Sequence, residues 1–281
     1  MKITSVPAVD ALLRTALTED AGNGDITTES TVPATATAYG RYIAKEDGVI
    51  CGWDIVRAVF DLLDPSIELK INVPEGEHFK KGDILAEVTG NAHCVLTGER
   101  VGLNLLQHMS SIATMTNEAV KKVEGTNAKI VDTRKTTLGL RYLEKYAVRC
   151  GGGTNHRFNL SDGVLIKDNH IVAAGSITNA VSAAKKRVPH TVKIEVEVED
   201  FDMLREALDA GADIIMLDNM SCEDMAKAVE IVGGRAITEA SGNMGERDLY
   251  EVASTGVDFI SIGALTHSVK ALDISLKFKL I

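Results

Sequence analysis

The second half of this 281-residue chain repeats one unit: a short apolar segment, a polar turn, and a stretch with the period of a helix. The centres of the last four apolar segments, near residues 195, 215, 238 and 261, are about 20 to 23 residues apart. That interval holds a strand, a helix of about three turns and two short loops. Strands that alternate with helices in this way pair in parallel through right-handed crossovers. The six predicted strands are 129–131, 163–166, 192–198, 213–217, 236–238 and 258–262.

Two architectures satisfy this pattern, a (β/α) barrel and an open doubly wound sheet. No G-x-G-x-x-G motif follows the first strand, which disfavours a dinucleotide-binding sheet. Six strands are fewer than the eight of a complete barrel. We therefore expect an α/β fold with an incomplete or irregular (β/α) barrel, and the polar residues at the strand ends, described below, favour it.

The first 125 residues have a different pattern, which predicts an α+β domain. Residues 6–18 and 53–63 have helical period, whereas 39–44 and 68–73 are strand-like. The segment 73–85 resembles the hammerhead turn of biotinyl and lipoyl carrier domains. No lysine follows it within 87–92, so we interpret the likeness as structural only.

The overall charge excludes some classes of partner. The chain has 40 acidic and 30 basic residues, a formal net charge of −10. A general nucleic-acid binder or a polybasic membrane-surface protein needs a basic surface, so neither nucleic acid nor membrane is an expected partner. The longest stretch without Asp, Glu, Lys or Arg, 101–117, contains too many polar residues for a membrane span.

The cysteines and the N-terminus favour the cytoplasm. The first residues contain no apolar segment typical of a secretory signal. Four cysteines are far apart and form no C-x-x-C pair, which favours reduced thiols over a disulfide framework or a zinc site. They are Cys51, Cys94, Cys150 and Cys222.

Five of the predicted strands end in polar residues that could take part in chemistry. A single charged residue after a strand is usually part of a solvated loop. In parallel β/α folds, however, the carboxyl ends of all the strands meet at one mouth, so five such ends predict a shared site. A sixth strand end, Gly263-Ala264, is small. The five polar strand ends are Thr133-Arg134-Lys135, Lys167-Asp168-Asn169, Glu197, Asp218-Asn219 and Ser241-Gly242-Asn243.

Residues 133–167 are positively charged within this acidic chain. The window contains seven Lys or Arg and two acids, a net charge of +5. We expect Arg141, Lys145 and Arg149, spaced by four, to lie on a solvated helix face. The remaining cations predict a basic pocket for a small polyanion, since Arg pairs bidentately with carboxylate or phosphate. They are Arg134, Lys135, Arg157 and Lys167, accompanied by His156.

Two further groups of residues fit a phosphorylated substrate. The loops 241–243 and 263–264 follow the last two predicted strands, where barrels often bind phosphate through backbone N–H groups. Glu197 and Asp218 end the two preceding strands. Paired carboxylates that face phosphates typically hold Mg²⁺ or ribose hydroxyls.

The segments that carry these side chains resemble the motifs of the quinolinate phosphoribosyltransferase family, over essentially the whole chain. One departure is Asn243, where many members have glycine. Asparagine tolerates unusual backbone angles, so we expect the loop to keep its shape. The matching segments are 19–28, 97–104, Thr-Arg-Lys-Thr at 133–136, Gly-Gly-Gly-Thr-Asn-His-Arg at 151–157, 165–170, 195–198, 217–219, 239–242 and 263–268.

The resemblance implies that quinolinate reacts with phosphoribosyl pyrophosphate, in the presence of Mg²⁺, to give nicotinate mononucleotide, pyrophosphate and CO₂ for NAD biosynthesis. It implies catalytic roles for Lys135, Lys167, Glu197 and Asp218, with Mg²⁺ or ribose hydroxyls on the two carboxylates. It also implies a homodimer in which Arg100 reaches the site of the second subunit. The implied substrate-binding residues are Arg100, Thr133, Arg134, Lys135, His156, Arg157, Lys167, Glu197, Asp218, Ser241, Gly242, Asn243, Ile262, Gly263, Ala264 and His267.

The family also implies two domains. Residues 1–110 would form an open-faced α/β sandwich joined by 268–281, and 111–267 would form the barrel. Two other functions remain open at this point. One is a relative of the same fold with another acceptor, such as nicotinate or the substrate of a molybdenum-transport-associated homologue. The other is a non-catalytic anion-binding or carrier protein, suggested by the hammerhead-like segment.

Overall fold

The chain forms two compact units. The computed structural model describes residues 3–281, and Met1 and Lys2, at the start of the segment searched for a signal sequence, lie outside the described residues. The first unit contains the residues up to Asn117, Thr137–Gly152 and Ser268–Ile281. The second unit contains Glu118–Thr136 and Gly153–His267. Residues 111–117 and 137–152, which were predicted to be part of the barrel, belong to the first unit.

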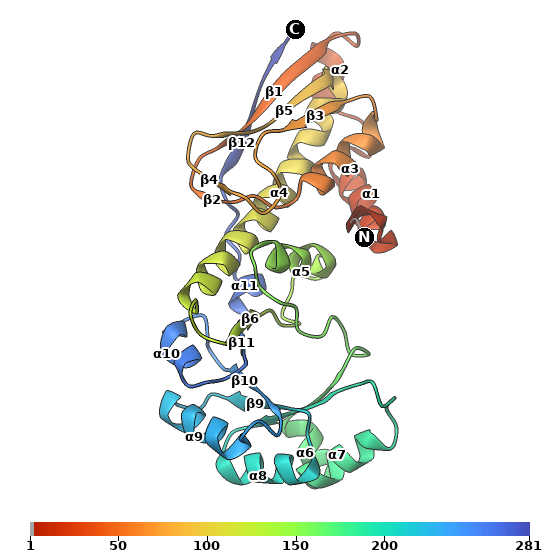
Figure 1. The fold of residues 1–281 in the computed structure, drawn as a ribbon. Helices are drawn as coiled ribbons and strands as arrows, with labels where there is room; N and C mark the ends of the chain where they lie inside the picture. Colours follow the sequence, from red (N-terminus) through yellow and green to blue (C-terminus); the bar gives the residue numbers. More distant parts are fainter. Residues whose placement is uncertain (1–2) are drawn as a thin grey trace. The chain divides into compact units, whose positions relative to one another are not determined.

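The first unit is built on a four-stranded antiparallel sheet, drawn in Figure 1. The last strand of the chain returns to pair with the first, so that Tyr42 lies opposite Leu276. A separate two-stranded sheet is formed by β2 (Gly48–Val49) and β4 (His78–Phe79). The order across the main sheet is β12 (Ile274–Leu280), β1 (Thr37–Ala44), β5 (Ile84–Asn91) and β3 (Glu68–Ile71).

Two apolar cores lie on either side of helices α3 (Trp53–Leu63) and α4 (Ala92–Lys122) in this unit. One core joins the sheet to the helices, and in it the rings of Tyr42 and Trp53 meet edge to face at 5.5 Å. The other core joins the same two helices to α1 and α5. The opposite face of the sheet is polar, since Tyr39 and Lys70 both contact Glu87 there. The helices are η1 (Ile3–Ser5), α1 (Pro7–Ala21), α2 (Ile26–Thr31), α3 (Trp53–Leu63), α4 (Ala92–Lys122) and α5 (Arg141–Cys150).

Helix α5 explains why 137–152 belongs to the first unit. Its residues Leu143, Ala147 and Val148 are buried in the second of the two cores. The expectation that Lys145 faces solvent is wrong, because this side chain is only 1% exposed. A spacing of four residues identifies one face of a helix, but it does not say whether that face meets solvent or another element.

The second unit is a parallel sheet of six strands, and all six correspond to predicted strands. The first and second strands along the chain are the two edges of the sheet. The barrel is therefore incomplete, as predicted, and it is open between these two strands. The order is β6 (Lys129–Val131), β11 (Phe259–Ser261), β10 (Ile237–Ser241), β9 (Ile214–Asp218), β8 (Ile194–Val198) and β7 (Val164–Ile166).

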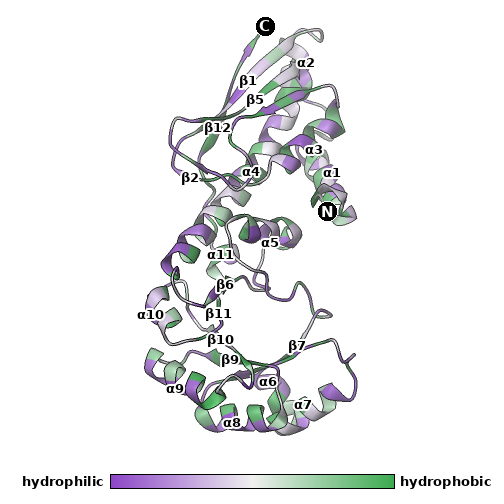
Figure 2. Ribbon diagram, viewed as in Figure 1, coloured by the Kyte–Doolittle hydropathy of each residue, from purple (hydrophilic) through white to green (hydrophobic). Residues whose placement is uncertain are grey.

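Helices follow the strands of this sheet and cover it on the outside (Figure 1). Local capping sets their ends: the Asp200 side chain accepts hydrogen bonds from the first turn of α8, and Gly211 ends α8 with a φ of 75°. Apolar and polar residues alternate along α8 in Figure 2, and its Leu204 and Ala207 are buried. The helices are α6 (Asp168–Ala174), α7 (Ile177–Lys185), α8 (Phe201–Ala210), α9 (Cys222–Val232), α10 (Leu249–Ser254) and α11 (Ala264–His267).

Candidate active site

A cavity of about 650 Å³ opens at the carboxyl ends of the parallel strands of the second unit. Its volume is in the range of small-molecule sites. Fourteen of the sixteen predicted substrate-binding residues line it, namely Thr133, Arg134, Lys135, His156, Arg157, Lys167, Glu197, Asp218, Ser241, Gly242, Asn243, Gly263, Ala264 and His267. Ile262 is buried and Arg100 lies on α4 of the first unit, and neither is among the lining residues.

Further lining residues were missed in the sequence. Glu239 and Met216 are the clearest cases, because each lies inside a strand, two residues before a predicted site residue. Side chains two residues apart on a strand point to the same face. The two-residue spacing from Asp218 and Ser241 could therefore have identified Met216 and Glu239 in the sequence. The missed residues are Leu165, Met216, Glu239, Met244, Gly245, Glu246 and Ser261, whereas Asn219 lines the cavity as its strand-end position predicted.

The charges of the cavity are divided rather than net positive. Four lining residues are Lys or Arg and four are Asp or Glu. The cations come from the segments that follow β6 and β7 and from the 153–157 loop, whereas three of the acids belong to β8, β9 and β10. The predicted net charge of +5 counted three cations of α5, which belongs to the first unit. The cavity therefore has a cationic side suited to an anion and an acidic side suited to hydroxyls or a metal ion.

Arg134 and Arg157 form the cationic side. Burial and then the nearby charge of Arg134 lower the pKa of Arg157 from its ordinary value. The Arg157 guanidinium donates through Nη1 to the carbonyl oxygen of Gly163, at 2.9 Å. Two guanidinium groups that repel one another in a partly buried site would both be stabilised by a bound carboxylate or phosphate.

A buried aspartate places the segment that carries His156 and Arg157. Asp132, at the end of β6 and 0% exposed, accepts hydrogen bonds from the His156 backbone N–H at 2.9 Å and from Asn155 Nδ2 at 2.6 Å. Thr154 also pairs in parallel with Val131 of β6. These bonds extend the edge of the sheet by a short segment and direct its side chains into the cavity.

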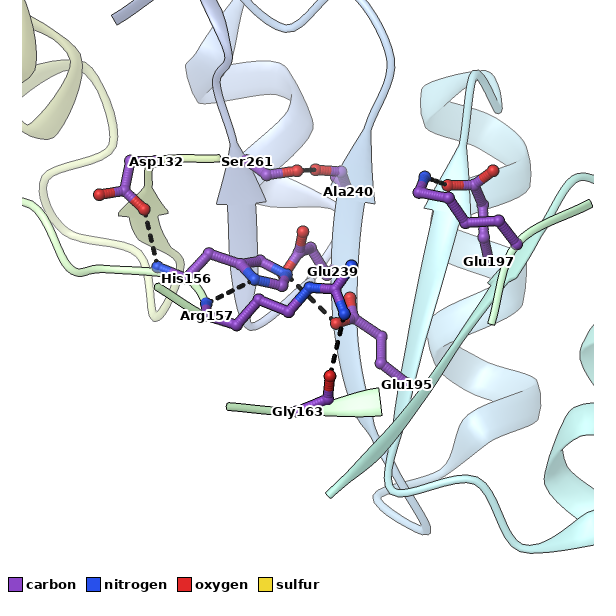
Figure 3. A network of polar contacts seen from close by, with 10 residues as sticks. Asp132, His156, Arg157, Gly163, Glu195, Glu197, Glu239, Ala240 and Ser261 are labelled. Carbon is purple, nitrogen blue, oxygen red and sulfur yellow. Dashed lines mark hydrogen bonds and ion pairs between the residues drawn. The ribbon is translucent and has the colours of Figure 1, made fainter. Parts of the chain in front are cut away.

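The imidazole of His156 has protein partners on both ring nitrogens (Figure 3). Its Nδ1 accepts from the Arg157 backbone N–H at 2.7 Å, which places the ring proton on Nε2. Nε2 lies 3.2 Å from Glu195 Oε2 and 3.6 Å from Glu239 Oε2. His156 was predicted as part of a cationic pocket, but these contacts direct its N–H toward two carboxylates.

Lys167 and Glu197, which both line the cavity, form an ion pair. Lys167 follows β7 and Glu197 lies on β8, so adjacent strands bring together residues 30 apart in the sequence. On β9, Asp218 accepts a hydrogen bond from Asn219 Nδ2 at 2.6 Å. The two carboxylates that were predicted to act together thus differ in environment, because among the ion pairs of the described residues only Glu197 has a cation beside it.

The loop after β10 has the backbone shape expected for it. Asn243 has a φ of 50° and Gly242 a φ of 97°, both in the left-handed region. Asparagine is among the few residues with a side chain that adopt this region readily, which explains why it can replace glycine at 243. The loop lines the same cavity as Gly263 and Ala264, which follow β11.

The cavity lies at the carboxyl ends of parallel barrel strands, and both paired guanidinium groups and carboxylates line it. Such a site defines the class of barrel enzymes that act on small polyanionic substrates. Within the described residues no helix is long and apolar enough to cross a membrane.

Comparison with known families identifies the chain more closely. The model of the quinolinate phosphoribosyl transferase N-terminal domain matches residues 25–110, and that of the C-terminal domain matches 112–277. The chain belongs to the quinolinate phosphoribosyltransferase family. It is 47% identical over 258 residues to a probable nicotinate-nucleotide pyrophosphorylase [carboxylating] of Bacillus subtilis, covering 92% of this chain and 89% of the relative. A relative of the same name from Methanocaldococcus jannaschii is 46% identical, covering 94% and 95%.

Solved structures support the same assignment. The nicotinate-nucleotide pyrophosphorylase of Francisella tularensis has a TM-score of 0.93 and 42% identity to this chain, and 99% of each chain is covered. NadC of Streptococcus pyogenes has a TM-score of 0.91 and 42% identity, and 97% of each chain is covered.

Proposed function

We propose that this protein transfers the phosphoribosyl group of phosphoribosyl pyrophosphate to quinolinate and releases CO₂, which gives nicotinate mononucleotide for NAD biosynthesis. The observation that carries the proposal is the presence, in one cavity, of the Arg134–Arg157 pair and the two small-residue loops at 241–243 and 263–264. The pair suits a dicarboxylate, and the loops suit a phosphate. Membership of the family supports the same reaction.

Quinolinate would bind on the cationic side of the cavity. Arg134 and Arg157 would hold its carboxylates, and Lys135 would lie between quinolinate and the pyrophosphate group. His156 would orient the neighbouring Arg157 through the bond between Nδ1 and the Arg157 backbone N–H. No side-chain nucleophile is needed, because the pyridine nitrogen itself attacks the ribose carbon.

Transfer would depend on positioning and electrostatics. As the bond to pyrophosphate lengthens, positive charge grows on the ribose carbon, and the carboxylates of Glu197 and Asp218 would stabilise it. Lys167 holds Glu197 in place in the free protein. Loss of CO₂ then leaves an electron pair on C2, next to a nitrogen that has become positively charged and stabilises that pair.

The acidic side of the cavity fits Mg²⁺, which prefers carboxylate and phosphate oxygens. Asp218 would hold the ion, and Glu197 would join it when Lys167 moves to the substrate. Bound there with the pyrophosphate group, the ion would neutralise charge on the leaving group.

We further propose a cytoplasmic homodimer in which Arg100 completes the site of the partner. Arg100 lies on α4 in the first unit and is not among the residues that line the cavity of its own chain. A dicarboxylate held by two guanidinium groups would gain from a third cation.

The test is an assay with quinolinate, phosphoribosyl pyrophosphate and Mg²⁺, in which release of CO₂ and formation of nicotinate mononucleotide are expected. Nicotinate, which lacks one carboxylate, should compete poorly. Substitution Arg134→Gln should raise KM for quinolinate by about tenfold or more, as expected for loss of a charged hydrogen bond. The exposed Arg187→Gln is the matched control. Absence of both CO₂ and nucleotide, or preference for nicotinate, would reject the proposal.

A further inference from the structure

Two carboxyl groups that line the cavity, Glu239 and Glu246, have no role in the transfer reaction, and of these only Glu239 is buried. Glu239 lies on β10, lines the cavity and is only 4% exposed. Its Oε2 lies 3.6 Å from His156 Nε2, and the same nitrogen is 3.2 Å from Glu195 Oε2 (Figure 3). Among the described residues, Oε1 of Glu239 and Oε1 of Glu195 are buried without a hydrogen-bond partner.

This geometry requires a proton. One oxygen of each carboxyl group and one nitrogen of His156 all lie within 4.8 Å of one another. Two buried carboxylates so close together cannot both remain charged at modest cost, since the imidazole supplies a single N–H for both. Glu239 holds the proton: burial, and then the charge of Glu195, raise the pKa of Glu239 to about 7.

The groups around Glu239 leave it at the wall of the cavity. Glu195 of β8 and His156 lie beside it, Ser261 comes from the neighbouring strand β11, and the charge of Lys167 acts on it from beyond β7. Glu239 lines the cavity, whereas Glu195 does not. An uncharged acid at this position can therefore approach a bound ligand directly.

The proposed reaction has a step that needs such an acid. Loss of CO₂ from C2 of the pyridine ring leaves C2 with an electron pair, and the product carries a hydrogen there. We propose that Glu239 is the catalytic acid that protonates C2 after CO₂ has left. The proposal rests on the proposed function of this site.

The step balances in atoms and charge. The bond between C2 and the carboxylate carbon breaks, and its electron pair stays on C2 beside the positively charged ring nitrogen. The O–H bond of Glu239 then breaks, the proton forms the new C–H bond at C2, and Glu239 becomes a carboxylate. Solvent restores the proton before the next turnover. His156 and Glu195 act as positioning groups.

The experiment compares Glu239→Gln with the wild-type enzyme in the presence of quinolinate, phosphoribosyl pyrophosphate and Mg²⁺. Pyrophosphate, CO₂ and nicotinate mononucleotide are measured separately, both in the first turnover and at steady state, from pH 5.5 to 10.5. The exposed Glu251→Gln on α10 is the control for an acid-to-amide change on the same unit.

For the wild-type enzyme we expect kcat for CO₂ release to fall as pH rises through about 7, because the acid loses its proton. In Glu239→Gln, kcat should drop by about 100-fold, the size of a general-acid contribution, and this pH dependence should vanish. KM for quinolinate should change little. The first turnover should still release about one equivalent each of pyrophosphate and CO₂ per site, with formation of nicotinate mononucleotide delayed behind them.

Several results would overturn the proposal. A variant with wild-type kcat and pH profile would show that Glu239 is not the donor. A raised KM with unchanged kcat would assign it to binding, and a wild-type profile that falls only near pH 10 would point to a lysine. If Glu239→Gln does not fold, the wild-type pH profile and that of Glu239→Asp test the proposal instead. Glu239→Asp keeps a carboxylic acid and should keep the fall in kcat with rising pH. If the wild-type enzyme releases neither pyrophosphate nor CO₂, the proposed function itself has failed.

Discussion

Gly242 and Asn219 approach one another so closely that a β-carbon on Gly242 would lie 2.2 Å from Asn219 Oδ1. Both residues also have positive φ angles, 97° and 55°. The loop after β9 and the loop after β10 are therefore shaped against one another at the mouth of the cavity.

The first prediction concerns this contact. Gly242→Ala should destabilise the protein by about 3 kcal/mol, since it combines an unfavourable φ with a steric clash, and should raise KM for phosphoribosyl pyrophosphate. Gly125→Ala is the matched control, because Gly125 has a φ of 85° but no atom within 4 Å of the added carbon. It should cost about 1 kcal/mol, and urea denaturation measures both. Equal costs would contradict the packing argument.

The second prediction concerns Asp132. Asp132→Ala removes the acceptor for the His156 backbone N–H and for Asn155, both in a buried site. We expect a loss of about 1–3 kcal/mol in the free energy of unfolding, together with a higher KM for quinolinate. Asp132→Asn keeps one acceptor oxygen and should recover part of both. A stable variant with unchanged KM would show that Asp132 does not position the segment.

The third prediction is a pH dependence of stability. The pKa of Glu239 is raised to about 7 in the folded protein, above its unfolded value. Its contribution is thus fully present below the unfolded pKa of about 4.5 and is lost as pH rises to about 7, an amount of order 3 kcal/mol. Glu239→Gln should therefore gain stability relative to wild type between pH 5 and pH 8. A constant difference across that range would refute the buried-acid assignment.

The fourth prediction tests the dimer. Arg100→Ala and Lys167→Ala should each be inactive, because one lacks the residue given to the partner and the other lacks a residue of its own cavity. Unfolding and refolding the two chains together should restore one intact site in each mixed dimer. Activity should approach about a quarter of the wild-type value, the random-mixing expectation for a two-chain assembly. Refolded mixtures that remain inactive would show that Arg100 does not act across an interface.

Much of the second unit was predictable, for a physical reason. All six strands and the helical stretches between successive strands follow from local periodicity. In the first unit, helix α3 was predicted at its observed bounds. Strand β5 and helix α4 were not predicted. In α4 the sequence contains many polar residues, and it is helical because it packs on two cores at once, which no local pattern reveals.

The site shows the same division. The sequence by itself determined the parallel strand-and-helix architecture and the strand-end residues Arg134, Lys167, Glu197 and Asp218, since chain connectivity alone brings parallel strand ends together. Only the tertiary structure decided that the cavity holds as many acids as cations, that Lys145 is buried, and that Glu239 shares the imidazole of His156 with Glu195. Glu195 and Glu239 are 44 residues apart and on strands that do not pair, so only the curvature of the sheet brings them within reach of one histidine.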